Sequence, residues 1–204
     1  GLTILLESWV REGGSAAIIQ HLQNPTERAR IRKEVAERVR KDLGDFDLMV
    51  ISRVQTEKNR QLIGKNLTEI GEIWKIDPVD AMLRLLEEEE ASVSFIGHGM
   101  SEENVERVLS HPLVMIGSDG WSMAPTGKAA ESRPHPRSYG AFARVLGYYV
   151  REKKLFDLPT AIKKMTSMPA SQSGLADRGR VAVGMKADLV VFNAALVKDE
   201  ATFE

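Results

Sequence analysis

The stretch Leu113-Val114-Met115-Ile116-Gly117-Ser118-Asp119-Gly120 joins a short apolar run to a turn that carries a carboxylate. Similar apolar runs occur at Phe46–Ser52 and at Ser92–Ile96, and amphipathic segments separate the three runs. Uninterrupted apolar strands with helices between them are typical of a parallel sheet buried on both faces. The sequence therefore predicts an α/β fold with three parallel strands.

Helix-start signals lie between these runs. Asn24-Pro25-Thr26-Glu27 combines a capping residue, a proline at the first helical position and a glutamate at the capping-box position. Asp77-Pro78 begins a second helix in the same way, and its last residues are Glu87–Glu90. We interpret these four acids as a solvated face, because acids at a helix C-terminus oppose the helix dipole. Further helices are predicted from Ser101, over about 138–153 and over 159–173.

The last part of the chain has a different pattern. Gly179–Phe192 contains two β-rich runs joined by a turn with Gly184, which predicts a hairpin. We therefore expect a second structural layer to begin near Arg178.

Composition excludes several classes of function. The 204 residues carry 28 Lys and Arg against 29 Asp and Glu, a formal net charge of −1. This balance argues against a nucleic-acid-binding domain and against a polybasic membrane anchor. The apolar runs are also far shorter than the about 20 residues of a membrane-spanning helix. Because cysteine is absent, disulfides, thiolate nucleophiles and Cys-ligated zinc are excluded, and we expect a cytoplasmic protein.

Two side chains are candidates for chemistry. Asp119 follows a predicted parallel strand, where α/β folds place their active sites, although Ser-Asp-Gly alone favours a simple turn. Arg137 ends the loop Glu131–Arg137, which two prolines stiffen and which also contains His135. Its guanidinium group is suited to a bidentate bond with a substrate carboxylate. Alternatively, the loop is only a proline-fixed entry into the next helix, with Arg137 on the solvent side of that helix.

The histidines do not form a metal-binding motif. His21, His98, His111 and His135 include neither a His-X-His pair nor a helical pair four residues apart. We therefore assign no metal ligand in this chain. Gly97-His98-Gly99 is only a weak match to a phosphate-binding turn, since a third glycine and a following Lys-Ser/Thr are missing.

Several stretches together resemble the N-acyl-D-amino-acid deacylases, or D-aminoacylases, of the amidohydrolase superfamily. The resemblance covers most of the chain from about Trp9 onward, and its pieces occur in the family's order and spacing. The stretches that carry it are Gly99–Val105, His111-Pro112, Met115–Gly120, His135–Gly147, Lys164–Ala170 and Gly179–Phe192.

This resemblance implies a fold that the chain contains only in part. A complete (β/α)₈ TIM barrel takes about 250 residues. We therefore expect residues 1–177 to be the last strands and helices of such a barrel, and residues 178–204 to be β-strands of a small β-sandwich domain. The chain would then be the C-terminal portion of a longer enzyme, with a possible oligomer through the exposed barrel edge.

The resemblance also implies an activity and roles for residues. The family hydrolyses the amide bond of N-acyl-D-amino acids with zinc, whose ligands correspond to residues upstream of Gly1 and are absent here. Asp119 would move a proton from the attacking water to the leaving nitrogen, and Arg137 would bind the substrate's α-carboxylate. Ser52 would be a further contact to that carboxylate.

Two alternatives remain open on the sequence. The chain could act alone as a non-enzymatic module that binds small carboxylates through Arg137. It could also belong to a related amidohydrolase that acts on a cyclic amide, although the His-Pro-Arg loop disfavours this assignment.

Overall fold

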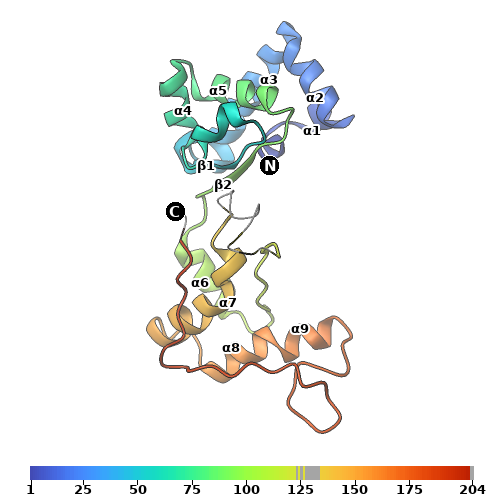
Figure 1. Ribbon diagram of the computed structural model, residues 1–204, viewed down its shortest axis with the longest axis vertical. Helices are drawn as coiled ribbons and strands as arrows, with labels where there is room; N and C mark the ends of the chain where they lie inside the picture. The colour runs from blue at the N-terminus through green and yellow to red at the C-terminus, as the bar shows by residue number, and fades with distance from the viewer. Residues whose placement is uncertain (123, 125, 127–133, 203–204) are drawn as a thin grey trace. The chain divides into compact units, whose positions relative to one another are not determined.

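The computed structural model describes residues 1–122, 124, 126 and 134–202, and the chain divides into two units (Figure 1). Of the described residues, the first unit contains 1–99, 124, 126 and 134, and the second contains 100–122 and 135–202. The elements of the first unit are η1 Leu2–Leu5, α1 Ser8–Arg11, α2 Gly14–Gln23, α3 Pro25–Arg38, η2 Val39–Leu43, η3 Phe46–Leu48, β1 Met49–Arg53, η4 Glu57–Leu62, α4 Leu67–Trp74, α5 Pro78–Glu88 and β2 Ser94–Gly97. Those of the second unit are α6 Glu102–Ser110, α7 Arg137–Arg144, η6 Val145–Glu152, α8 Leu158–Met165 and α9 Ser167–Gln172.

The predicted helix starts are confirmed where a capping side chain begins them. The Asn24 side chain accepts hydrogen bonds from the amides of Thr26 and Glu27 at 3.0 and 3.2 Å, and it begins α3. The Asp77 side chain accepts from the amide of Val79 at the start of α5. These bonds satisfy amides that have no partner inside the helix, so the signal is local and can be read from sequence.

The predicted parallel pairing of strands is wrong. β1 and β2 pair antiparallel, with Met49 opposite Gly97 and Ile51 opposite Phe95. One helix is predicted between these runs, at Asp77-Pro78, whereas the structure has both α4 and α5 there (Figure 1). A single helix returns the chain to the end where the first strand began, which gives parallel strands, and a second helix reverses that direction once more.

The additional helix, α4, has its own start signal. The Asn66 side chain accepts a hydrogen bond from the Glu69 amide at 2.8 Å, and the Glu69 carboxylate accepts one from the Asn66 amide at 2.7 Å. This reciprocal pair is a capping box. Gly71 then lets α4 approach the start of α5 closely, because a Cβ on it would lie 2.8 Å from the carbonyl oxygen of Ile76 in the connection and 3.3 Å from Pro78 N.

The core of the first unit is formed by its helices and by β1. Its largest fully buried side chains are Leu2, Leu6, Leu22, Ile31, Met49, Ile51, Leu62, Leu67, Ile70, Met82, Leu83 and Leu85. The buried face of α5 includes Val79, Met82, Leu83 and Leu86.

The third apolar run forms no strand in the structure. None of residues 113–117 is in a strand, and Leu113 is 77% exposed. Ile116 instead packs into a second core with Val145, Tyr149 and Ala161. The Ile116 amide donates to the carbonyl oxygen of Lys164 at 3.1 Å, so the end of α8 takes the place of a neighbouring strand.

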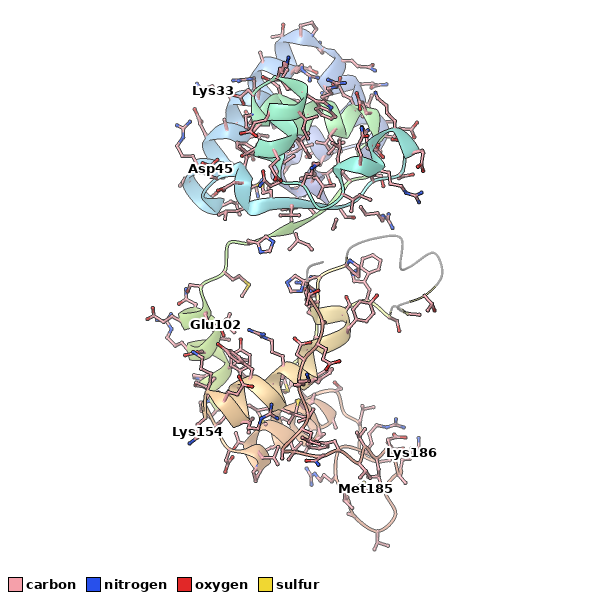
Figure 2. The ribbon with its side chains drawn as sticks, turned by 60° about the vertical axis from the view of Figure 1, so that its left-hand side comes forward. Lys33, Asp45, Glu102, Lys154, Met185 and Lys186 are labelled. Carbon is pink, nitrogen blue, oxygen red and sulfur yellow. The ribbon has the colours of Figure 1, made fainter. Side chains whose placement is uncertain are left out.

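The predicted hairpin at Gly179–Phe192 is also not formed. Residues 173–202 contain no strand, and Val183 and Val191 are fully exposed. A strand needs a partner for its backbone and a surface for its apolar face, and this segment has neither along its valines. Figure 2 labels Met185 and Lys186 in the loop that the segment forms after α9.

Further along, the C-terminal segment lies against η6. Arg151 Nη1 donates to the carbonyl oxygen of Val197 at 2.5 Å, and a Cβ on Gly147 would lie 2.8 Å from that oxygen. The predicted boundary between residues 177 and 178 is not tested by these contacts and stays a prediction. Among the described residues, no helix has both the length and the apolar character to cross a membrane.

Candidate functional site

Asp119 lies in a tight turn of the second unit, between the apolar run 113–117 and α7. Its φ is +47°, in the left-handed region that Asp tolerates better than most residues. The Ser118 hydroxyl accepts a hydrogen bond from the Gly120 amide at 3.1 Å. The residue is therefore part of a turn and also presents its carboxylate outward, since its side chain is 87% exposed.

The structure brings Arg137 to Asp119. Arg137 is the first residue of α7, and its Nη2 lies 2.9 Å from Asp119 Oδ2. Arg137 Nε also donates to the main-chain oxygen of Asp119 at 3.0 Å. An ion pair this exposed adds little to the stability of the fold. Its main effect is to keep the guanidinium group and the carboxylate beside each other.

The start of α7 holds the turn and Arg137 together. The Trp121 amide donates to the Ser138 hydroxyl at 3.4 Å, and a Cβ on Gly120 would lie 2.8 Å from Ser138 Cα. His135 Nδ1 accepts from the Arg137 amide at 3.1 Å, which assigns that nitrogen as an acceptor. Arg137 thus begins a helix and also faces the carboxylate of Asp119. The first three residues of its loop, 131–133, lie outside the described residues.

Lys164, in the last turn of α8, is a buried residue that the sequence pattern does not indicate. Its side chain is buried, with the residue 2% exposed, and its Nζ donates to the carbonyl oxygens of His111 and Val114 at 2.5 and 2.9 Å. Burial lowers the pKa of this ammonium group below its usual value. The pattern Lys163-Lys164 in a last helical turn gives no sign of which lysine is buried.

Ser52 lies in the other unit. It is on β1, is 8% exposed and lies at the irregularity in the β1–β2 ladder between Ile51 and Arg53. Its predicted contact with a substrate carboxylate is not tested by contacts within the first unit.

The acidic run Glu87–Glu90 at the end of α5 is solvated at Glu90 as predicted, but not at Glu89. Glu89 is 1% exposed, and its carboxylate accepts hydrogen bonds from the amides of Gln55 and Thr56 at 2.5 and 2.9 Å. The Thr56 hydroxyl and Asn59 Nδ2 donate to its other oxygen. The prediction failed because the loop after β1, distant in sequence, folds over the end of α5.

Glu88 completes this carboxylate cluster. Partial burial opposes its ionisation, but hydrogen bonds from Lys58, Arg84 and Asn59 prevail and lower its pKa to about 2. Lys58 Nζ and Arg84 Nε lie 2.8 and 2.9 Å from Glu88 Oε1. Hydrogen bonds likewise outweigh burial for Glu89, whose pKa is lowered. The cluster therefore fixes the loop that follows Ser52.

The part of the chain that the structure describes does not supply a metal centre. No group of three His, Cys, Asp or Glu side chains in it is arranged to hold a metal ion. His21 Nδ1 lies 2.9 Å from Glu27 Oε2, and His111 Nδ1 accepts from the Leu113 amide at 3.3 Å. These residues do not fit a zinc site by themselves, so no reaction step through zinc is derived from them.

Comparison with curated proteins finds deacylases. The chain is 45% identical over 141 residues to an N-acyl-D-glutamate deacylase of Alcaligenes xylosoxydans xylosoxydans, an alignment that covers 69% of this chain and 26% of that protein. It is 50% identical over 105 residues to a D-aminoacylase of the same organism, covering 52% of this chain and 20% of the relative. The chain thus spans about a quarter of the length of the curated relatives it matches.

Solved structures give the same result. An N-acyl-D-glutamate deacylase from Bordetella bronchiseptica, crystallised with zinc and a phosphonate mimic of the tetrahedral intermediate, matches with a TM-score of 0.68 and 36% identity. That match covers 82% of this chain and 31% of the other. A D-aminoacylase with a binuclear metal centre matches with a TM-score of 0.65 and 39% identity, over 76% of this chain and 30% of its own.

The family profile extends over nearly the whole sequence. The model of the family described as "Amidohydrolase family" matches residues 18–203, which include Ser52, Asp119 and Arg137. The similar deacylases described above are metal-dependent hydrolases of amide bonds. This chain belongs to the amidohydrolase family.

Proposed function

We propose that this chain carries the proton-transfer residue and the carboxylate-binding residue of a metal-dependent N-acyl-D-amino-acid deacylase. The observation that carries the proposal is the pairing of Asp119 with Arg137, 2.9 Å apart at the turn before α7. The similarity to deacylases of acylated D-glutamate, together with a zinc-containing solved structure, supports the reaction class.

The spacing of these two groups suits an N-acyl amino acid. The amide nitrogen and the carboxylate of such a substrate are attached to the same α-carbon. A carboxylate held by the Arg137 guanidinium group would therefore bring the amide nitrogen to the neighbourhood of Asp119. A guanidinium fork is also the side chain best matched to a carboxylate.

The proposed chemistry is amide hydrolysis. Water adds to the acyl carbonyl carbon, Asp119 accepts a proton from that water, and the C–N bond breaks as Asp119 gives the proton to the leaving nitrogen. The products are a carboxylic acid and a free D-amino acid. Arg137 holds the α-carboxylate throughout, and Ser52 is proposed as a second contact to it.

The architecture around this site is proposed from the same similarity. Residues 1–177 would be the last part of a (β/α)₈ barrel, and residues 178–204 would contribute strands to a small β-sandwich domain. An oligomer through the exposed barrel edge is proposed on the same basis. The exposed valines of the segment 179–192 support the proposed β-sandwich strands, because they leave an apolar, β-prone surface uncovered.

A non-enzymatic carboxylate-binding module is the second candidate. The observation that favours it is that Arg137 is exposed and suited to bind an anion, while the described residues hold no set of metal ligands. The two candidates differ in the role of Asp119, which is needed for turnover but not for binding.

The test is an assay of the full-length gene product with zinc and N-acyl-D-amino acids. We expect Asp119→Asn to lower kcat by about 10²–10⁴-fold, the usual contribution of a general acid–base. Arg137→Met is expected to raise KM. Asp188→Asn is the matched control, since Asp188 forms a similar exposed pair with Arg178 at 3.0 Å. Near-normal turnover by Asp119→Asn would refute the proposed role, and carboxylate binding without turnover by the wild type would favour the module.

A further inference from the structure

The side chain of Lys164 is an unusual feature of the second unit. It is 2% exposed, although Lys163 beside it in the same helical turn is exposed to solvent. Among the described residues, its hydrogen bonds go to the main-chain oxygens of His111 and Val114, and not to a carboxylate. The Phe156 ring lies 5.8 Å from the ammonium nitrogen.

Such a group is costly to bury. An ammonium ion loses hydration in an apolar site, and here burial lowers the pKa of Lys164. Charge-assisted hydrogen bonds to carbonyl oxygens offset part of this cost. An apolar side chain at this position would avoid the cost altogether, so the two bonds to the main chain are the evident use of the charge.

These bonds fix one stretch of main chain. Lys164 Nζ holds the chain at His111 and Val114, and the Lys164 carbonyl oxygen accepts from the Ile116 amide at 3.1 Å. The three bonds attach residues 111–116 to the last turn of α8. Asp119 follows three residues later, in a turn that is hydrogen-bonded to Arg137 and Ser138.

We propose that Lys164 is a positioning residue for Asp119, because it fixes the main chain that leads into the catalytic turn. This inference rests on the proposed function. Lys164 acts through the backbone and does not contact substrate. A displacement of a catalytic group by about 1 Å can cost about 10²-fold in rate. Loss of the hydrogen bonds between Lys164 and residues 111–116, which we call the Lys164 clamp, should therefore have a measurable effect on turnover.

The experiment compares Lys164→Met with Lys163→Met in the full-length gene product with zinc. We expect Lys164→Met to lower kcat by about 10- to 100-fold with KM changed less than about threefold, because Arg137 is held separately by α7. Lys163→Met should leave both parameters near wild type. Lys164→Arg, which keeps a charged donor, should recover part of the loss. Equal kcat values for Lys164→Met and wild type, per folded molecule, would overturn the inference.

A double-mutant cycle separates this inference from the proposed function. If Lys164 acts through Asp119, Lys164→Met should lower kcat little further in the Asp119→Asn background. If Lys164→Met lowered kcat in the Asp119→Asn background by the same factor as in the wild type, Lys164 would have a general structural role, and the inference would be overturned. Failure of Asp119→Asn alone to reduce turnover would instead refute the proposed function.

A measurement on the unaltered protein covers the case in which Lys164→Met does not fold. The clamp predicts slow hydrogen exchange at the Ile116 amide, comparable with amides inside α8. Exchange there as fast as in the exposed segment 179–192 would contradict the clamp.

Discussion

The guanidinium group of Arg137 contacts Asp119 in two ways, through Nη2 to the carboxylate at 2.9 Å and through Nε to the main-chain oxygen at 3.0 Å. The second contact does not depend on the Asp119 side chain. The turn therefore stays anchored when the carboxylate is changed, which permits its chemistry to be tested separately from the fold.

Stability of the Asp119→Asn variant follows from this double contact. Asp119 is 87% exposed, and Asn accepts a positive φ as readily as Asp. We expect the free energy of unfolding to change by less than about 0.5 kcal/mol, as for other surface substitutions. Urea titration checks this, and a loss of about 2 kcal/mol would mean that the carboxylate also supports the turn.

Gly120→Ala is expected to disturb the same turn. Its Cβ would lie 2.8 Å from Ser138 Cα and 3.1 Å from the Arg137 carbonyl oxygen, so backbone must shift. We expect a destabilisation of about 1–3 kcal/mol and a lower kcat. Gly117→Ala is the control, because a Cβ there meets nothing within 4 Å. Equal behaviour of the two variants in thermal unfolding and in turnover would contradict the close approach.

The carboxylate cluster after α5 predicts a pH dependence of stability. The pKa of Glu88 is lowered to about 2 and that of Glu89 is lowered below its usual value of 4.5. A carboxyl group whose pKa is lower in the folded state stabilises the fold above about pH 4.5 and loses this contribution as the pH falls towards the folded-state pKa. We therefore expect the free energy of unfolding to decrease between about pH 4.5 and 2.

Glu89→Gln should remove the Glu89 contribution to this effect and leave that of Glu88. A glutamine can keep an oxygen towards the amides of Gln55 and Thr56, but its NH2 group then faces the Asn59 Nδ2 donor, at a cost of about 2 kcal/mol at pH 7. Glu90→Gln, at the exposed neighbouring position, should change stability little. Denaturant unfolding at pH 7 and at pH 3 measures both, and equal losses for the two variants would contradict the assignment of Glu89 as the buried acceptor.

The capping box of α4 can be tested by substitution at its first residue. Asn66→Ala removes the acceptor of the Glu69 amide, and we expect a loss of about 1 kcal/mol. Asn66→Ser keeps an acceptor and should retain most of the stability. A neutral effect of the alanine variant in urea titration would show that packing alone holds α4.

The exposed valines of the C-terminal segment provide a test of the missing hairpin. Val183 is fully exposed, so Val183→Lys should change stability by less than about 0.5 kcal/mol in this 204-residue chain. Val145→Ala, in the second core, should cost about 1–3 kcal/mol. A large loss for Val183→Lys would mean that the segment packs.

The prediction from sequence was good where the signal lies within a few residues. The caps at Asn24, Asp77 and Ser101 each bond to amides two or three positions ahead, and their helices begin as expected. The capping box of Asn66 and Glu69 has the same local character but was not used. The parallel pairing was inferred from the uninterrupted apolar character of the runs, which does not specify strand direction.

Burial could not be predicted in the same way. Glu89 and Lys164 both lie in charged runs at helix ends, where solvent exposure is the ordinary expectation. Each is covered by a segment that is distant in the chain, the loop 54–59 for Glu89 and residues 111–116 for Lys164. Nothing near either residue in the sequence indicates that contact.

The sequence by itself determined the helix starts, the membership in the amidohydrolase family, and the choice of Asp119 and Arg137 as candidates, since short motifs encode these. Only the tertiary structure decided that β1 and β2 run antiparallel, that Lys164 binds the main chain at His111 and Val114, and that Arg137 binds Asp119. The physical reason is that strand direction and burial depend on partners far along the chain, whereas a helix cap or a tight turn is complete within a few residues.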